Sequence, residues 1–165
     1  MKIIFLDIDG VLCTSRSHLS KHGRGGLMDE WDDVGALAIK RACEFGTNVK
    51  IVISSTWRKF CLNPRDNSDI LGVRLAQFQL TQFLHPDWRT KELNGIRGHE
   101  IAKWMEEHPN ATDYIILDDD SDFLKHQYKN LIRTDFENGM SYSDIKKLVM
   151  WTGAYNVQEA NLQQS

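Results

Sequence analysis

The 165-residue sequence has few of the features that mark secreted or membrane proteins. It contains only three cysteines and no Cys-x-x-Cys pair, which argues against a disulfide framework or a zinc knuckle. No apolar run is long enough to cross a bilayer. Asp7 and Asp9 interrupt the apolar run at the N-terminus, so it is too short for a signal peptide. We therefore expect a cytoplasmic protein that does not associate with membranes.

The sequence also lacks an excess of basic residues. Its net charge of −3 predicts no electrostatic surface for binding extended duplex nucleic acid. A small phosphorylated ligand, or a nucleic-acid end held by a few local contacts, is still compatible with this charge. The length and the hydrophobic content of 41% are those of one globular domain.

Several short apolar runs are typical of buried strands. They are continuous rather than alternating, which favours a parallel sheet covered on both faces. The predicted strands are residues 2–6, 49–53, 114–117 and 130–132, with a weaker candidate at 82–85.

Helical spacing of apolar residues occupies the segments between these runs. We expect helices over residues 31–45, ending at Gly46, over 71–78, after Gly98, and after the capping box Ser141-x-x-Asp144. The alternation of strands and helices predicts a doubly wound, Rossmann-like α/β fold with a parallel sheet and helices on both faces. Ligands of such folds bind beyond the carboxyl ends of the strands.

The predicted organisation is a single domain over residues 1–151, followed by a polar tail over 152–165. The segment 12–29 is short, basic and glycine-containing, which favours a mobile flap over a folded cap. The segment 59–94 has room for a modest insert. We therefore expect the cap over the site to be small or absent.

Asp7 and Asp9 follow the first predicted strand directly. The two-residue period of a strand predicts that both carboxylates lie on the same side. Such a pair is costly through mutual repulsion unless a cation or a shared proton relieves it. A hard divalent ion such as Mg²⁺ is the expected remedy. Gly10 then lets the chain turn away from the site.

A second acidic cluster follows the strand at 114–117. Asp118 and Asp119 come directly after Ile-Ile-Leu and would complete a magnesium site with Asp7. The next residues, Asp120 to Asp122, fit a solvated turn or a helix cap equally well. The pattern leaves open which of Asp118, Asp119 and Asp122 contact the metal.

Hydroxyl groups follow the second predicted strand. Ser54 and Ser55 are candidates for binding the oxygens of a phosphate, although hydroxyls at this position also serve as helix caps. Arg58 follows closely, and its planar fork suits a phosphate or a leaving group. A surface arginine near Trp57 is the alternative.

A further cation is needed to hold a phosphate next to the carboxylates. Arg97 stands at the start of a predicted helix, near the expected rim of the sheet. Lys91 and Lys103 compete for this role. We favour Arg97.

Together these motifs resemble the haloacid dehalogenase (HAD) superfamily of phosphatases. The first motif of that family is present as Asp7-Ile8-Asp9-Gly10-Val11, the second as Ile51-Val52-Ile53-Ser54, and the fourth as Ile115-Ile116-Leu117-Asp118-Asp119. Arg97 would supply the basic residue of the third, where lysine is commoner. The finer pattern is similar to phosphatase-like domains of RNA-repair proteins and of free-standing bacterial and phage proteins.

The resemblance implies a chemistry for each part of the pattern. Asp7 would be the nucleophile that forms an aspartyl-phosphate, and Asp9 would be the general acid and base. Mg²⁺ would be held by Asp7, Asp9, Asp118 and Asp119. The substrate would be a nucleotide or a nucleic-acid phosphate end. The alternatives are another small phosphorylated metabolite, or a non-catalytic phospho-acceptor or binding module. The sequence does not predict an oligomeric state.

Overall fold

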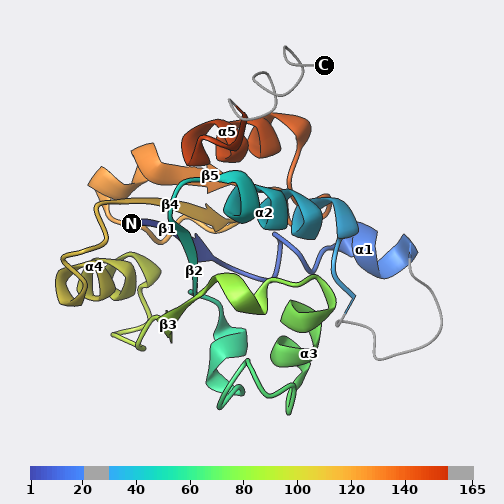
Figure 1. Cartoon of the computed structure of the whole chain (residues 1–165), viewed down its shortest axis with the longest axis horizontal. Helices are drawn as coiled ribbons and strands as arrows, with labels where there is room; N and C mark the ends of the chain where they lie inside the picture. Colours follow the sequence, from blue (N-terminus) through green and yellow to red (C-terminus); the bar gives the residue numbers. More distant parts are fainter. Residues whose placement is uncertain (21–29, 156–165) are drawn as a thin grey trace.

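A computed structural model describes residues 1–20 and 30–155 and contains one five-stranded sheet (Figure 1). The strand order is β3-β2-β1-β4-β5, and all four neighbouring pairs are parallel. The predicted doubly wound α/β fold is thereby confirmed. The strands are β1 (Lys2–Leu6), β2 (Val49–Ile53), β3 (Leu84–Arg89), β4 (Asp113–Asp118) and β5 (Leu131–Arg133).

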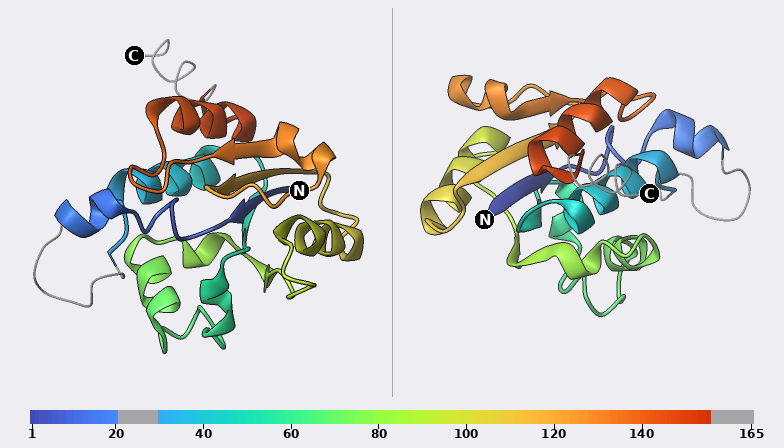
Figure 2. Two further views of the ribbon diagram at one scale, coloured as in Figure 1. Left: turned by 180° about the vertical axis from the view of Figure 1, so that it is seen from behind. Right: turned by 45° about the horizontal axis from the view of Figure 1, so that its top comes forward.

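Helices cover both faces of the sheet (Figures 1 and 2). Ile4 and Leu6 of β1 belong to the apolar cluster that contains residues of α2, α3 and α5. Ile3 and Phe5 belong to a second cluster with α4. Both faces of the central strands are therefore buried, which explains their continuous apolar sequences. The helices are α1 (Ser15–Ser20), α2 (Asp33–Phe45), α3 (Ile70–Gln77), α4 (Arg97–Glu107) and α5 (Tyr142–Thr152).

The end of α2 and the start of α5 lie at the residues that the sequence predicts. Gly46 is the C-terminal cap of α2, and its N–H donates to the Ala42 carbonyl oxygen. At the start of α5, Ser141 and Asp144 form the capping box. These local side-chain and main-chain bonds fix the ends of both helices.

The edge strand β3 begins and ends later than the weak candidate at 82–85. It contains Pro86 and Asp87 in place of a continuous apolar run. A strand at the edge of a sheet tolerates proline and polar residues because one of its sides has no neighbouring strand to pair with. Hydrophobic pattern alone therefore misplaces this strand.

The segment 59–94 is part of the domain body. Leu71 and Leu75 of α3 are buried in the main apolar cluster, and β3 belongs to the sheet. Three short 3-10 helices complete the described chain: η1 (Thr56–Lys59), η2 (Thr81–Phe83) and η3 (Lys125–Asn130). Within residues 1–20 and 30–155, no separate cap domain is present. Residues 21–29 of the expected flap lie outside the described residues.

The body of the domain extends beyond the predicted boundary at residue 151. Thr152 is fully buried, and its hydroxyl donates to the Val149 carbonyl oxygen. Ala154 is also buried. The rest of the predicted tail, from residue 156 on, lies outside the described residues. None of the described helices is long and apolar enough to span a membrane.

Candidate active site

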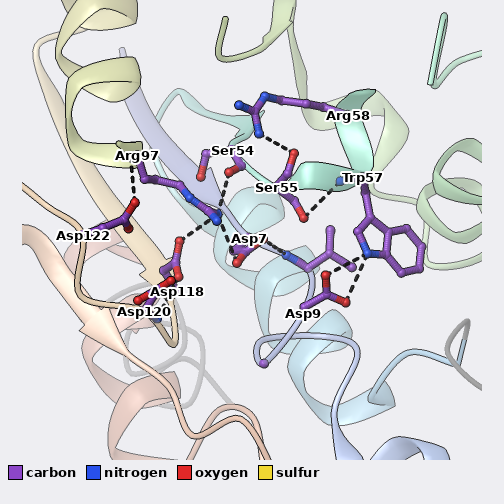
Figure 3. Close-up of polar contacts among 12 residues, drawn as sticks. Asp7, Asp9, Ser54, Ser55, Trp57, Arg58, Arg97, Asp118, Asp120 and Asp122 are labelled. Carbon is purple, nitrogen blue, oxygen red and sulfur yellow. Dashed lines mark hydrogen bonds and ion pairs between the residues drawn. The ribbon is translucent and has the colours of Figure 1, made fainter. Parts of the chain in front are cut away.

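The carboxyl ends of three central strands bring Asp7, Ser54 and Asp118 to one rim of the sheet (Figure 3). Leu6 of β1 pairs in register with Ile53 of β2 and with Leu117 of β4. The residue after each of these strand positions therefore lies at the same level. The Asp7 N–H donates to the Leu117 carbonyl oxygen at 3.0 Å, and the Ser54 N–H to that of Leu6 at 2.9 Å.

Three carboxylates form a compact acidic group at this rim. Asp7, Asp118 and Asp119 each offer an oxygen, and these oxygens lie within 4.8 Å of one another. Asp118 is fully buried and Asp7 is only 5% exposed. Burial, together with the charge of Asp7, raises the pKa of Asp118 to about 8. Burial and the charge of Asp7 also raise the pKa of Asp119.

This acidic group fits a hard divalent cation. Buried carboxylates repel one another, so their charged forms need a positive partner. Carboxylate oxygens are the ligands that Mg²⁺ prefers, and one or two carboxylates plus substrate oxygens and water usually suffice. Asp7, Asp118 and Asp119 are therefore the residues that could hold the ion.

Arg97 is the cation that the fold places in this group. Its Nη1 lies 3.1 Å from Asp7 Oδ2 and 3.0 Å from Asp118 Oδ2. Nη1 also donates to the Ser54 carbonyl oxygen at 2.6 Å. Burial alone would lower the pKa of Arg97, but these carboxylates and Asp122 raise it overall.

The two competing lysines lie elsewhere on the surface. Lys91 pairs with Glu107 at 2.9 Å, and Lys103 pairs with Glu106 at the same distance. Both lysine side chains are about half exposed or more. Of the three candidate cations, the structure brings only Arg97 to the acidic group.

Asp122 holds the first turn of α4. Its Oδ2 accepts a hydrogen bond from the Arg97 N–H at 2.9 Å, and its carbonyl oxygen accepts one from the Gly98 N–H at 3.1 Å. A Cβ atom at Gly98 would lie 2.6 Å from Gln127 Oε1. Asp122 therefore serves the helix start that carries Arg97 and stands outside the three-carboxylate group.

The two serines after β2 differ in their environment. Ser54 is fully buried, and its Oγ has no hydrogen-bond partner among residues 1–20 and 30–155. A buried hydroxyl without a partner is costly, so this group is suited to a ligand. The Ser55 Oγ instead accepts from the Trp57 N–H and caps η1. Ser55 therefore has the capping role that its residue type also permits.

Arg58 does not face the acidic group. Its guanidinium is buried, and Nη2 lies 2.6 Å from Glu100 Oε2. In Figure 3, Ser54 and Ser55 lie between Arg58 and Asp7. This position is inconsistent with the predicted contact of Arg58 with a phosphate.

The sequence analysis did not identify Glu100 as a candidate residue. Its position in the sequence could have indicated a buried carboxylate, because Glu100 lies on the apolar side of a helix, four residues before the buried Trp104.

The Asp9 carboxylate lies apart from that of Asp7. Both of its oxygens accept from Trp57 Nε1 at 3.1 Å (Figure 3). The regular two-residue period behind the expected shared side does not extend to Asp9, because β1 ends at Leu6 and the Asp9 carboxylate is bound by Trp57. Burial raises the pKa of Asp9, and the charge of Asp7 adds to this, while the bond from Trp57 opposes it.

Gly10 permits the close approach of Asp119. Its φ is +69°, and a Cβ atom there would lie 2.3 Å from Asp119 Cγ. The Gly10 carbonyl oxygen also accepts from the Thr134 hydroxyl at 2.9 Å. The glycine thus serves both the turn after Asp9 and the placement of the third carboxylate.

Comparison with known proteins agrees with this architecture. The family model described as "HAD domain in Swiss Army Knife RNA repair proteins" matches residues 3–145. The chain belongs to this family of HAD domains, and the predicted resemblance is thereby confirmed. The family supports a phosphatase-type function. Comparison with the curated proteins and with the solved structures gave no match.

Replacing Gly10 with alanine tests the packing of Asp119. We expect G10A to weaken Mg²⁺ binding measured by titration calorimetry, because the new Cβ atom displaces Asp119. G95A is the matched control, since Gly95 has the same φ of +69° but nothing within 4 Å of its Cβ position. It should lose only the strain of a left-handed alanine, about 1–2 kcal/mol of unfolding free energy. Equal Mg²⁺ affinity in the two variants would contradict this account.

Metal binding is expected to depend on pH. Below its raised pKa of about 8, Asp118 carries a proton that a metal ion must displace. The apparent Mg²⁺ affinity should therefore rise with pH, by up to about tenfold per pH unit, and level off above the pKa. Calorimetry in buffers of different ionisation enthalpy would detect the released proton. A pH-independent affinity without proton release would show that Asp118 is not a ligand.

Proposed function

We propose that the protein is a magnesium-dependent phosphoric monoester hydrolase that acts through an aspartyl-phosphate on Asp7. One observation carries this proposal: a buried acidic group, the Arg97 guanidinium and the unpartnered Ser54 hydroxyl meet at the carboxyl end of one parallel sheet. A phosphate monoester carries two negative charges, so it needs compensating cations and hydrogen-bond donors. This rim offers both beside a carboxylate.

Asp7 is well placed to act as the nucleophile. Its Oδ1 accepts from the Ile8 N–H at 2.8 Å, and its Oδ2 pairs with Arg97. Two partners thus orient the carboxylate. In the first step an Asp7 oxygen forms a bond to phosphorus, and the bond from phosphorus to the leaving oxygen breaks. Bound Mg²⁺ would neutralise charge on the phosphoryl oxygens.

Asp9 is the proposed proton donor and acceptor. It gives its proton to the leaving oxygen in the first step. In the second it takes a proton from the water that attacks phosphorus, and the bond from phosphorus to the Asp7 oxygen breaks. Its raised pKa and its separation from the acidic group support this role. Trp57 holds the carboxylate in place, so we assign Asp9 to proton transfer and not to side-chain metal binding.

Ser54 and Arg97 are the proposed phosphate ligands. The Ser54 hydroxyl is free to donate to a phosphoryl oxygen. Arg97 bonds to Asp7 through Nη1, so the two groups lie side by side before a substrate arrives. Such preorganisation stabilises the charge that moves onto phosphoryl oxygens in the transition state.

The proposed substrate is a nucleotide or a nucleic-acid phosphate end. The described residues form no cap domain over the rim, which leaves room for a large substrate. The family's link to RNA-repair proteins supports the same class. Phe60, just beyond η1, is 85% exposed and is available to stack on a base. Trp88 is buried in the main apolar cluster and has a packing role instead.

The Asp7→Asn variant tests the central residue. With Mg²⁺ present, the wild type should hydrolyse p-nitrophenyl phosphate, nucleoside monophosphates or phosphorylated oligonucleotides, and D7N should release no phosphate. Chelation by EDTA should also abolish turnover. D66N, which changes an exposed carboxylate outside the site, should keep full activity. A wild type inactive on all these substrates would refute the proposal. Lasting phosphorylation without turnover would instead indicate a phospho-acceptor module.

The Asp9→Asn variant tests proton donation. An alkoxide leaves poorly without a proton, whereas p-nitrophenolate is stable by itself. We expect D9N to lower kcat more for glycerol phosphate than for p-nitrophenyl phosphate. W57F, which removes the indole N–H that orients Asp9, should change the two substrates in the same direction but less. An equal loss for both substrates would exclude the acid role.

A further inference from the structure

We propose that Arg58 and Glu100 are positioning residues, whose buried ion pair fixes the Arg97 guanidinium against Asp7 and Ser54. This inference rests on the proposed function, in which Arg97 binds the phosphate. It gives Arg58 a different role from that of a phosphate ligand. It also assigns a role to Glu100, which lies outside the acidic group.

The ion pair is almost fully withdrawn from solvent. The side chains of Arg58 and Glu100 are 6% and 5% exposed, and their closest atoms lie 2.6 Å apart. The other Glu100 oxygen, Oε1, accepts from the Leu93 N–H at 3.2 Å. The Arg58 Nε donates to the Thr90 carbonyl oxygen at 2.9 Å. The pair therefore joins the segments that follow β2 and β3 to α4.

Arg97 and Glu100 each attach α4 to the segment 54–58, which follows β2. They are three residues apart on α4, so both side chains leave the same side of the helix. Arg97 Nη1 donates to the carbonyl oxygen of Ser54. Glu100 binds Arg58, whose Nη1 donates to the carbonyl oxygen of the next residue, Ser55. The first turn of α4 is thus held at two adjacent carbonyl groups.

Both of these attachments can persist when a phosphate binds. The contacts of Arg97 with Ser54, Asp7 and Asp118 use Nη1, and the guanidinium carries further N–H donors that can face the ligand. In Figure 3, Arg58 lies beyond Ser55 as seen from Asp7, and its ion-pair partner among the described residues is Glu100. The ion pair can therefore hold the helix start while Arg97 engages substrate.

The matched variants are E100Q and E106Q. Both remove a carboxylate charge from α4, but Glu106 is exposed and pairs only with Lys103 in the described structure. With p-nitrophenyl phosphate and Mg²⁺, E100Q should lower kcat/KM by about 10- to 100-fold, as expected for a displaced binding group. E106Q should leave it unchanged. R58K keeps the charge but loses the planar fork, so it should resemble E100Q.

A double-mutant cycle with Arg97→Lys separates positioning from general stability. If Glu100 acts through Arg97, E100Q should reduce kcat/KM much less in the R97K background than in the wild type. An equal factor in both backgrounds, in step with the loss of thermal stability, would overturn the proposal. If E100Q does not fold, R58K/R97K completes the same cycle.

A spectroscopic measurement keeps the proposal testable apart from the activity. The guanidinium NMR signals of Arg97, assigned by their loss in R97K, should shift or broaden in E100Q and stay unchanged in E106Q. Unchanged signals in folded E100Q would overturn the positioning role even in an active enzyme. A wild type without phosphatase activity, but with this NMR response, would refute the proposed function and leave the positioning role in place.

Discussion

Two buried carboxylates meet at the carboxyl end of the sheet, and one guanidinium nitrogen of Arg97 lies within about 3 Å of both. Two buried carboxylates repel one another. Burial and the charge of Asp7 raise the pKa of Asp118, and the charge of Arg97 opposes this rise. Much of the surrounding structure keeps Arg97 in place. Asp122 caps its helix, and Gly98 lets that helix approach the loop after β4. The rim thus holds buried charges of both signs, the arrangement on which the proposed metal and phosphate binding rests.

The different roles proposed for Asp7 and Asp9 follow from the backbone that carries each residue. Asp7 follows Leu6 and Asp118 follows Leu117, the last pair in register between β1 and β4. Asp9 stands two residues later, directly before the turn at residues 10–12, and its carboxylate accepts hydrogen bonds from Trp57 Nε1. This difference supports the proposal that Asp7 binds the metal and attacks phosphorus, while Asp9 transfers the proton. Separation of the two carboxylates is what a nucleophile and a general acid require of the same short motif.

The fold class and the gathering of Asp7, Ser54 and Asp118 at one rim were predictable from the sequence, because buried parallel strands have continuous apolar sequences and their carboxyl ends coincide. The placement of Arg97 at a helix start followed in the same way. The partners of Arg58 and Asp9 were not predictable. Glu100 and Trp57 lie 42 and 48 residues from them along the chain, and only the packing of α4 and η1 on the sheet brings these pairs together. The bounds of β3 could also not be predicted from the sequence, because an edge strand needs no continuous apolar run.

In the proposed mechanism, Asp7 carries the phosphoryl group between the two steps. Rapid acid quench of the protein during turnover with Mg²⁺ and p-nitrophenyl phosphate, followed by peptide mass spectrometry, tests this most directly. We expect the added mass of one phosphoryl group on the peptide that contains Asp7, removable by hydroxylamine because an acyl phosphate is cleaved by this reagent. Turnover without any phosphorylated peptide, or with the phosphoryl group on another residue, would contradict this mechanism.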